Sequence, residues 1–217
     1  GTTSTGSNTV GNVRMTGGTL ALPDYILIAR SIGSQCAFTV DGGTIYHTNA
    51  LNNLSIGYEG GRGELNLTGG MIENYGKPLT VRQSLNNSTG IVNLCAGSLS
   101  VDSFQNTSPG IALLNFAGGT LKVGNADSAV FIPTSMTGVY SYGPFGAYAG
   151  GAVIDAMNRT NTVTAPIRAP TGNGVYAITL TDKGSGYIGE PYVAITGPDG
   201  LGATAVANME DDGLGSN

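Results

Sequence analysis

Five carboxylates are the residues of this chain that could act on a polysaccharide. They are Asp41, Glu59, Glu64, Glu73 and Asp102. A glycoside hydrolase places two carboxyl groups around one bond. Glu64 and Glu73 flank one Gly-Gly pair and Asp41 precedes another, but no short segment carries two carboxylates on one face. We therefore predict that the chain is not an enzyme. A polysaccharide-active enzyme stays open as an alternative.

The other residues suited to acid–base or metal chemistry are isolated in the sequence. His47 is the only histidine, so neither a Ser–His–Asp triad nor a histidine-based metal site can form. We interpret it as a surface residue or a structural residue with satisfied hydrogen bonds. A lyase would need a basic residue beside calcium, and Arg62 and Arg82 stand alone. The sequence predicts no cofactor and no metal.

A stretch rich in tyrosine and glycine is the candidate binding site. Residues 139–151 contain Tyr140, Tyr142, Phe145 and Tyr148. Tyrosine combines an apolar ring with a polar tip, which suits contact with sugars or proteins. The alternative is a loop whose tyrosines pack on the core. We take these four aromatic residues as candidate binding residues.

The composition limits the class of protein. Hydrophobic residues make up 40% of the 217 residues, enough to build a core. Glycine, at 36 residues, is well above average usage, but no Gly-X-Y period indicates collagen. The net charge is −5 and the 9 basic residues are scattered, which excludes nucleic acid as a main partner. Apolar runs are too short for a membrane-spanning helix.

A repeat dominates the first half of the chain. Its pattern is apolar-x-apolar-x-Gly-Gly-Thr-apolar-x-apolar, and the second glycine, with some variation around it, falls at Gly18, Gly43, Gly70, Gly97 and Gly119. A further apolar run closes most units, as at 25–29, 54–58 and 79–82. Each unit therefore reads as strand, Gly-Gly corner, strand, polar turn, strand and loop.

The repeat predicts how the units pack. Alternation within each strand turns one face inward, and a unit of three short strands cannot bury that face alone. Units stacked at roughly 4.8 Å would pair every strand with its counterparts. Equivalent side chains would then form two internal columns, one of Leu20, Ile45, Ile72, Leu99 and Leu121, the other of Met15, Val40, Leu67, Leu94 and Phe116.

Two folds fit the Gly-Gly pairs. They could mark hairpin turns of an antiparallel sandwich, but the constant register of both flanking strands favours an all-β fold of the parallel β-helix or β-solenoid type. Cys36 and Cys95 would then lie two coils apart, roughly 9–10 Å along the axis. A disulfide needs Cα atoms within about 7 Å, so we expect none.

The pattern divides the chain into five parts. We expect a polar N-terminal arm at 1–10, solenoid repeats at 11–133, an irregular aromatic and glycine-rich loop with a terminal rung at 134–170, a small C-terminal β module at 171–209 and an acidic tail at 210–217. Within the module we expect strands at 175–181, 191–196 and 203–207. So small a module is marginal alone and should dock on the end of the solenoid or pair with another subunit.

The corners and a later segment carry a family resemblance. Gly-Gly-Thr-Leu corners precede Gly150-Gly151-Ala152-Val153-Ile154-Asp155. Over roughly residues 11–168 the chain resembles the autotransporter-associated β-strand repeat proteins, which implies a passenger or long surface protein of bacteria. Gly184-Ser185-Gly186-Tyr187 resembles the turn of a small β module of bacterial surface and phage fibre proteins. Neither resemblance transfers a catalytic residue.

These observations predict a structural or adhesive building block of an extracellular or cell-surface protein. Its expected partner is itself, head to tail or by strand addition, or adjacent repeats of a longer chain. Glycans are a second candidate partner, and no nucleic acid or membrane span is expected. Because the chain starts at Gly1, we expect a processed chain or a segment of a longer one.

Overall fold

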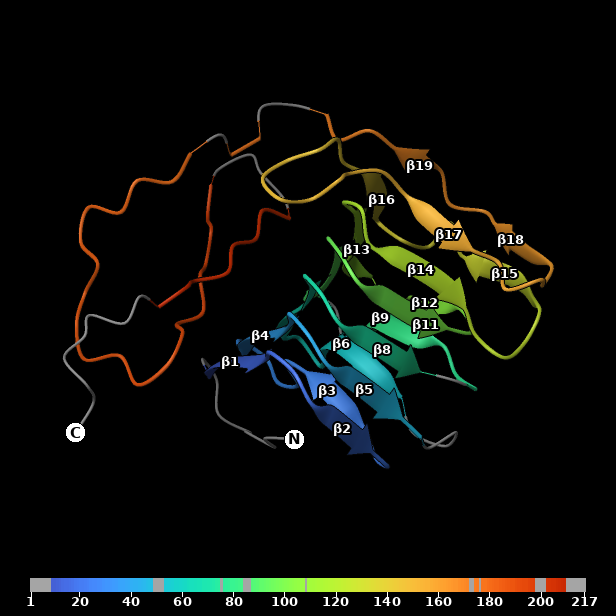
Figure 1. The fold of residues 1–217 in the computed structure, drawn as a ribbon, viewed down its shortest axis with the longest axis horizontal. Helices are drawn as coiled ribbons and strands as arrows, with labels where there is room; N and C mark the ends of the chain where they lie inside the picture. The colour runs from blue at the N-terminus through green and yellow to red at the C-terminus, as the bar shows by residue number, and fades with distance from the viewer. Residues whose placement is uncertain are drawn as a thin grey trace.

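The structure is a computed structural model that describes residues 9–48, 53–74, 76–83, 87–107, 109–171, 174–175, 177–197 and 202–209. Within these ranges the chain is all-β and contains no helix. None of these residues therefore belongs to an apolar helix long enough to cross a bilayer. The strands wind into a parallel β-solenoid of about six turns (Figure 1).

Three sides of the solenoid are formed by stacked parallel strands. The seven-stranded sheet contains β1 (Val10–Met15), β4 (Gln35–Val40), β7 (Arg62–Leu67), β10 (Ser88–Leu94), β13 (Gly110–Phe116), β16 (Gly138–Ser141) and β19 (Ile167–Arg168). The six-stranded sheet contains β2 (Thr19–Leu22), β5 (Thr44–His47), β8 (Met71–Asn74), β11 (Ser98–Val101), β14 (Thr120–Val123) and β17 (Val153–Asp155). The third side contains β3 (Ile26–Ile28), β6 (Leu54–Tyr58), β9 (Leu79–Gln83) and β12 (Phe104–Gln105), followed by the pair β15 (Ser128–Ile132) and β18 (Asn161–Val163).

All ladders between these named strands are parallel. Hairpin-connected strands would be antiparallel, so the sandwich alternative is wrong for these sheets. The predicted β-solenoid is confirmed.

Both predicted columns exist in the core. In the six-stranded sheet the register joins Leu20, Ile45, Ile72, Leu99 and Leu121 in that order. In the seven-stranded sheet it joins Met15, Val40, Leu67, Leu94 and Phe116. A third column of Ile26, Leu54, Leu79 and Phe104 fills the remaining side. Apolar side chains therefore stack on apolar side chains along the interior, and together they form one continuous buried core.

The Gly-Gly corners are places where successive coils touch through backbone. Gly70 has a φ of +63°, a conformation that L side chains rarely adopt. The amide of Met71, the next residue, donates a hydrogen bond of 2.9 Å to the carbonyl of Gly43 in the coil before. A Cβ on Gly70 would lie 2.7 Å from that carbonyl oxygen. The corner thus needs glycine both for its turn and for the hydrogen bond between coils.

The coils continue beyond residue 133, the last residue of the solenoid repeats expected from the sequence. β16 pairs with β13, β17 with β14 and β19 with β16. The sixth corner is Gly150-Gly151, which exchanges backbone hydrogen bonds with the fifth: Gly150 donates to Ala117 and Gly118 donates to Gly151. Residues 142–149 form an insertion between β16 and this corner, and this coil is the terminal rung expected within residues 134–170.

The C-terminal segment differs from the predicted three-stranded module. Of the strands expected at 175–181, 191–196 and 203–207, the described residues form only an isolated antiparallel bridge between Tyr192 and Val206. The segment is too small to enclose a core of its own. The predicted docking on the end of the solenoid is also wrong, because the segment runs along the side of the seven-stranded sheet (Figure 1).

The two cysteines are not bonded to each other, as predicted. Burial raises the pKa of the Cys95 thiol to about 11. The thiolate is the reactive form of cysteine, so Cys95 is a packing residue with little reactivity at neutral pH.

Alanine at a corner glycine tests the stacking of coils. We expect Gly70→Ala to lower the free energy of unfolding by more than about 1 kcal/mol, because it forces a positive φ and a clash with the carbonyl of Gly43. Gly17→Ala is the matched control: a Cβ there meets no atom within 4 Å, and the expected change is within about 0.5 kcal/mol. Urea unfolding followed by circular dichroism measures both, and equal effects would contradict the role of the corners.

Candidate functional site

The outer face of the seven-stranded sheet is covered by a C-terminal segment, here called the strap (residues 190–197 and 202–208). The strap contacts the sheet over several coils. At one end Asn12 of β1 donates to the carbonyl of Glu190, at 3.0 Å. Toward the other end, Gly202 lies so close to Leu113 of β13 that a Cβ would come within 2.6 Å of its Cδ1. The strap therefore runs along the solenoid axis and crosses strands β1 to β13.

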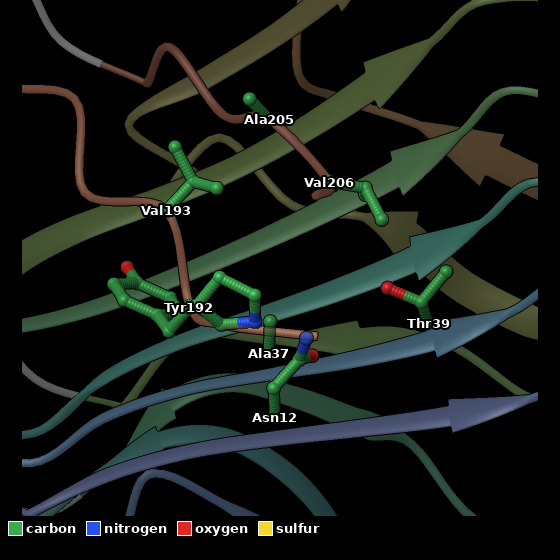
Figure 2. Close-up of a pocket in the computed structure, with 8 residues that line it drawn as sticks. Asn12, Ala37, Thr39, Tyr192, Val193, Ala205 and Val206 are labelled. Atoms are coloured by element: carbon green, nitrogen blue, oxygen red, sulfur yellow. The ribbon is translucent and has the colours of Figure 1, made fainter. Parts of the chain in front are cut away.

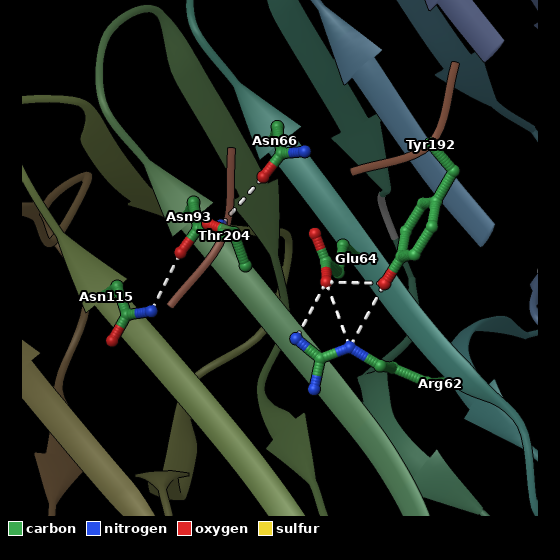
Figure 3. A network of polar contacts seen from close by, with 7 residues as sticks. All are labelled: Arg62, Glu64, Asn66, Asn93, Asn115, Tyr192 and Thr204. Atoms are coloured by element: carbon green, nitrogen blue, oxygen red, sulfur yellow. Dashed lines mark hydrogen bonds and ion pairs between the residues drawn. The ribbon is translucent and has the colours of Figure 1, made fainter. Parts of the chain in front are cut away.

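A triangle of polar groups fixes the middle of the strap (Figure 3). Alternation along β7 turns Arg62 and Glu64 outward, on the same face. The Tyr192 hydroxyl of the strap donates to Glu64 Oε1 at 2.9 Å, and Arg62 Nη2 donates to the same oxygen at 2.9 Å. Arg62 Nε also donates to the Tyr192 hydroxyl at 3.0 Å. Three groups from two distant parts of the sequence thus meet around one carboxylate oxygen.

Glu64 is fully buried under the strap. Burial raises the pKa of its carboxyl, because a charge loses its hydration there, while the charge of Arg62 and the hydrogen bonds from Tyr192 and Arg62 act in the opposite direction. Burial also raises the pKa of the Tyr192 phenol, which the negative charge of Glu64 raises further. The Tyr192 hydroxyl therefore stays a donor to Glu64 over the physiological pH range.

A ladder of asparagine side chains runs beside this triangle. Asn66, Asn93 and Asn115 occupy the same register position on successive strands. The Asn115 amide donates to the carbonyl oxygen of Asn93, and the Asn93 amide donates to that of Asn66, each at 2.7 Å. From the strap, the Thr204 hydroxyl accepts a hydrogen bond from the Asn93 amide at 3.0 Å. The ladder is a directional row of donors and acceptors on one face of the sheet (Figure 3).

One end of the strap lies against the first two coils. Around Tyr192 the seam between sheet and strap is lined by Asn12, Ala37 and Thr39 on the sheet side and by Pro191, Tyr192, Val193, Ala205 and Val206 on the strap side (Figure 2). Arg14 of β1 closes this end by binding Asp41 in the next coil and Glu190 and Asn208 in the strap. The ion pairs of Arg14 are partly exposed, so each stabilises the contact only modestly.

The candidate catalytic carboxylates do not come together. The register neighbours of Glu64 are Ala37 and Ile91, and Glu73 lies on β8 in a different sheet. A pair of carboxyl groups around one bond is therefore not formed by Glu64 and Glu73. The remaining three candidates bind local partners: Asp41 accepts from Arg14 and Thr68, Glu59 faces Arg30 at 3.9 Å and Asp102 accepts from the amide of Asn125.

The basic candidates have structural contacts. His47 is buried, with Nδ1 2.6 Å from Asn74 Oδ1 and Nε2 2.9 Å from the carbonyl oxygen of Asp24, which confirms the structural interpretation. Arg82 is buried and donates to Asn106, and burial lowers its pKa. No group of three or more potential metal-ligating side chains occurs in the part of the chain that the structure describes.

Three of the four predicted aromatic binding residues meet in the insertion between β16 and the sixth corner. Phe145 packs edge-on against Tyr142 and Tyr148, with ring centroids 6.4 and 5.3 Å apart, and 48% of Phe145 is exposed. Tyr140 lies instead on β16, one coil beyond Asn115 in the asparagine ladder. These residues thus fall into two places, and their binding role stays a prediction.

The strap interface was not foreseen from the sequence, although a signal was present. Ile91 and Leu113 occupy outward positions of β10 and β13, in the same register as Glu64. Both are buried although neither belongs to the solenoid core. Large apolar side chains at positions that should face water indicate that another part of the chain covers them.

No protein-family model, curated protein or solved structure matches this chain.

The buried carboxyl of Glu64 predicts a pH dependence of stability. Because its pKa is raised in the folded protein, its contribution to stability is fully present below the ordinary glutamate pKa of about 4.3 and is lost as the pH rises through the raised value. We expect the unfolding free energy of the wild type, relative to Glu64→Gln, to fall as the pH rises above about 4.

Urea unfolding at a series of pH values measures this difference. Glu59→Gln is the control, since Glu59 is a carboxylate with a side chain that is 40% exposed, and we expect its difference from the wild type to be small throughout. A Glu64→Gln difference that stays constant with pH would contradict the assigned burial effect.

Proposed function

We propose that this chain is a structural segment of an extracellular or cell-surface β-solenoid protein. Its coils stack on like coils, supplied by adjacent repeats or by a second copy. The fold supports this proposal because a solenoid is extended in one direction and each coil contacts only its neighbours. The resemblance of the corners to autotransporter-associated repeats supports the surface location.

The observation that carries the proposal is the open end of the first coil. Val13 lies in register with Phe38 and Leu20 with Ile45, yet Val13 is 57% and Leu20 38% exposed. The outer edges of β1 and β2 pair with no strand among the described residues. Another coil placed there would bury these side chains and satisfy the backbone groups of both edges.

The opposite end offers a matching surface. Ile167 on β19 continues the inward column of Val139 and is 40% exposed, and β17 and β19 are the last strands of their sheets. The two ends are different surfaces, so their contact is heterologous, and such contacts repeat without closing into a ring when no rotation brings the ends together. Head-to-tail association of copies would therefore produce filaments.

A charge at the open end tests this association. We expect Val13→Asp to abolish concentration-dependent assembly, because it places a carboxylate in the surface that the next coil would cover. Val130→Asp is the matched control: Val130 is 44% exposed on β15, on the side of the solenoid. Sedimentation velocity over a concentration series and negative-stain microscopy measure assembly. A wild type that remains monomeric at high concentration contradicts self-association.

A second candidate function is adhesion through the aromatic cluster of Tyr142, Phe145 and Tyr148. The observation in its favour is the partial exposure of Phe145 between the two tyrosines. Binding on a glycan array that disappears in both Tyr142→Ala and Tyr148→Ala would support it. Binding that survives both substitutions would exclude the cluster as the site.

A further inference from the structure

Buried polar atoms without a partner gather beneath the strap. Among the described residues, ten buried side-chain atoms have no hydrogen-bond partner, and six of them lie where strap and sheet meet. Five belong to the sheet: Asn12 Oδ1, Thr39 Oγ1, Glu64 Oε2, Asn66 Nδ2 and Asn115 Oδ1. The sixth, Glu190 Oε2, belongs to the strap. An unpaired buried polar group destabilises the state that buries it, so the strap is an incomplete match for this face.

The two ends of the asparagine ladder lack hydrogen-bond partners. It ends in an unpaired donor, Asn66 Nδ2, on one side and in an unpaired acceptor, Asn115 Oδ1, on the other. Glu64 Oε2 and Asn12 Oδ1 also lack donors. A hydroxyl group both donates and accepts and rotates to suit its partner. A chain rich in hydroxyl groups could therefore pair with every one of these atoms.

The functional groups by which the strap binds the sheet indicate which functional groups a ligand of this face would need. A hydroxyl, that of Tyr192, binds Glu64 and Arg62, and a second, that of Thr204, binds Asn93. A carboxylate, that of Glu190, binds Arg14 at the end of the face, where the side-chain amide of Asn208 also binds. Hydroxyl, carboxylate and amide groups presented along a line are the functional groups of an acidic oligosaccharide with acetamido substituents.

We propose that the outer face of the seven-stranded sheet, from Asn12 to Asn115, is a binding site for an acidic, hydroxyl-rich oligosaccharide, and that the strap is its built-in competitor. The site is separate from the coil ends and from the aromatic cluster of Tyr142, Phe145 and Tyr148. Tyr140 continues the asparagine ladder by one coil and offers a ring with a polar tip at its end.

The geometry favours an oligosaccharide over other occupants. A peptide bound by strand addition needs a free sheet edge, whereas the inner strands of this sheet, such as β7 and β10, are paired on both sides. A nucleic acid carries one charge per nucleotide and needs a row of basic residues, whereas on this face only Arg14 has a carboxylate partner that belongs to the strap, Glu190, and Arg62 stays paired with Glu64. Recognition on this face must therefore use side chains.

The strap can leave without disturbing the solenoid. The ladders of the seven-stranded sheet join only solenoid strands, and the one bridge of the strap, Tyr192 to Val206, lies within the strap itself. Residues 177–189, which lead into the strap, are exposed. The apparent affinity for a ligand on this face is then its intrinsic affinity reduced by the fraction of molecules in which the strap is open.

Two substitutions in the full chain should change the affinity for the oligosaccharide in opposite directions. Tyr192→Phe keeps the ring and removes the hydroxyl that holds the strap on Glu64, so we expect about tenfold tighter binding of a hyaluronan oligosaccharide, the effect of losing one hydrogen bond to a charged group. Asn115→Ala removes an acceptor that has no hydrogen bond to the strap among the described residues. We expect it to weaken the same binding about tenfold in either background.

Isothermal titration calorimetry measures the affinities, and hydrogen exchange measured by mass spectrometry follows the strap. Addition of the hyaluronan oligosaccharide should speed exchange in peptides from residues 190–208. A chito-oligosaccharide of equal length carries acetamido and hydroxyl groups without carboxylates, so it should bind more weakly because it brings no carboxylate to Arg14 in place of Glu190. Tyr187→Phe, which removes an exposed hydroxyl before the strap, should bind like the wild type.

Three outcomes overturn the proposal. One is no binding of either oligosaccharide to Tyr192→Phe when hydrogen exchange shows that its strap is open. Another is binding that Asn115→Ala leaves unchanged, which would place the ligand elsewhere, such as on the aromatic cluster. The third is binding without faster exchange in the strap. If Tyr192→Phe fails to fold, Glu190→Gln loosens the strap at Arg14 instead, and the same tighter binding is expected.

Discussion

Parallel stacking in register is the constraint on which this structure depends. Each strand contributes backbone groups on both edges, and these groups are paired only where the next coil places a strand at the same position. The corner shows how strict this is, because the amide of Met71 reaches the carbonyl of Gly43 through space that any side chain on Gly70 would fill. Once the corners are aligned, the register of the flanking strands follows, and with it the columns of Leu67 and Ile72 in the core.

The same constraint determines which parts of a coil can differ from one coil to the next. Its corners and inward positions are held by the coils above and below, so differences between coils accumulate in the loops and on the outer face. The insertion at residues 142–149 leaves the sixth corner paired with the fifth. The outer face carries residues as different as Ala37, Glu64 and Ile91 at one register position. A solenoid thus offers a rigid frame on which an outer surface can be varied without changing the core.

Two opposing effects determine how strongly the strap binds to this outer surface. Ile91 and Leu113 lose contact with water beneath it, which favours docking. Glu64 and the asparagine ladder are buried at the same time, and several of their atoms gain no partner, which opposes docking. The apolar contacts and the Tyr192 hydroxyl hold the strap in place, while the unmatched polar atoms keep that hold weak. This balance is what makes the covered face a candidate binding site in addition to a packing interface.

The sequence by itself determined the architecture of a single coil and the way in which coils stack. Gly18, Gly43, Gly70 and Gly97 repeat with their flanking apolar residues, and because each coil contacts only its neighbours, a local pattern is enough to predict strands, corners and core columns. For the sixth coil it indicated only a terminal rung within residues 134–170, since the insertion before Gly150 changes the spacing without changing the stacking. The strap was decided only by tertiary structure. Tyr192 lies 128 residues from Glu64, and no periodicity links a segment of that distance to the strand it covers. The outward Ile91 and Leu113 indicate that a cover exists, but only the folded chain shows which segment supplies it, because side-chain complementarity across such a separation leaves no repeat in the sequence.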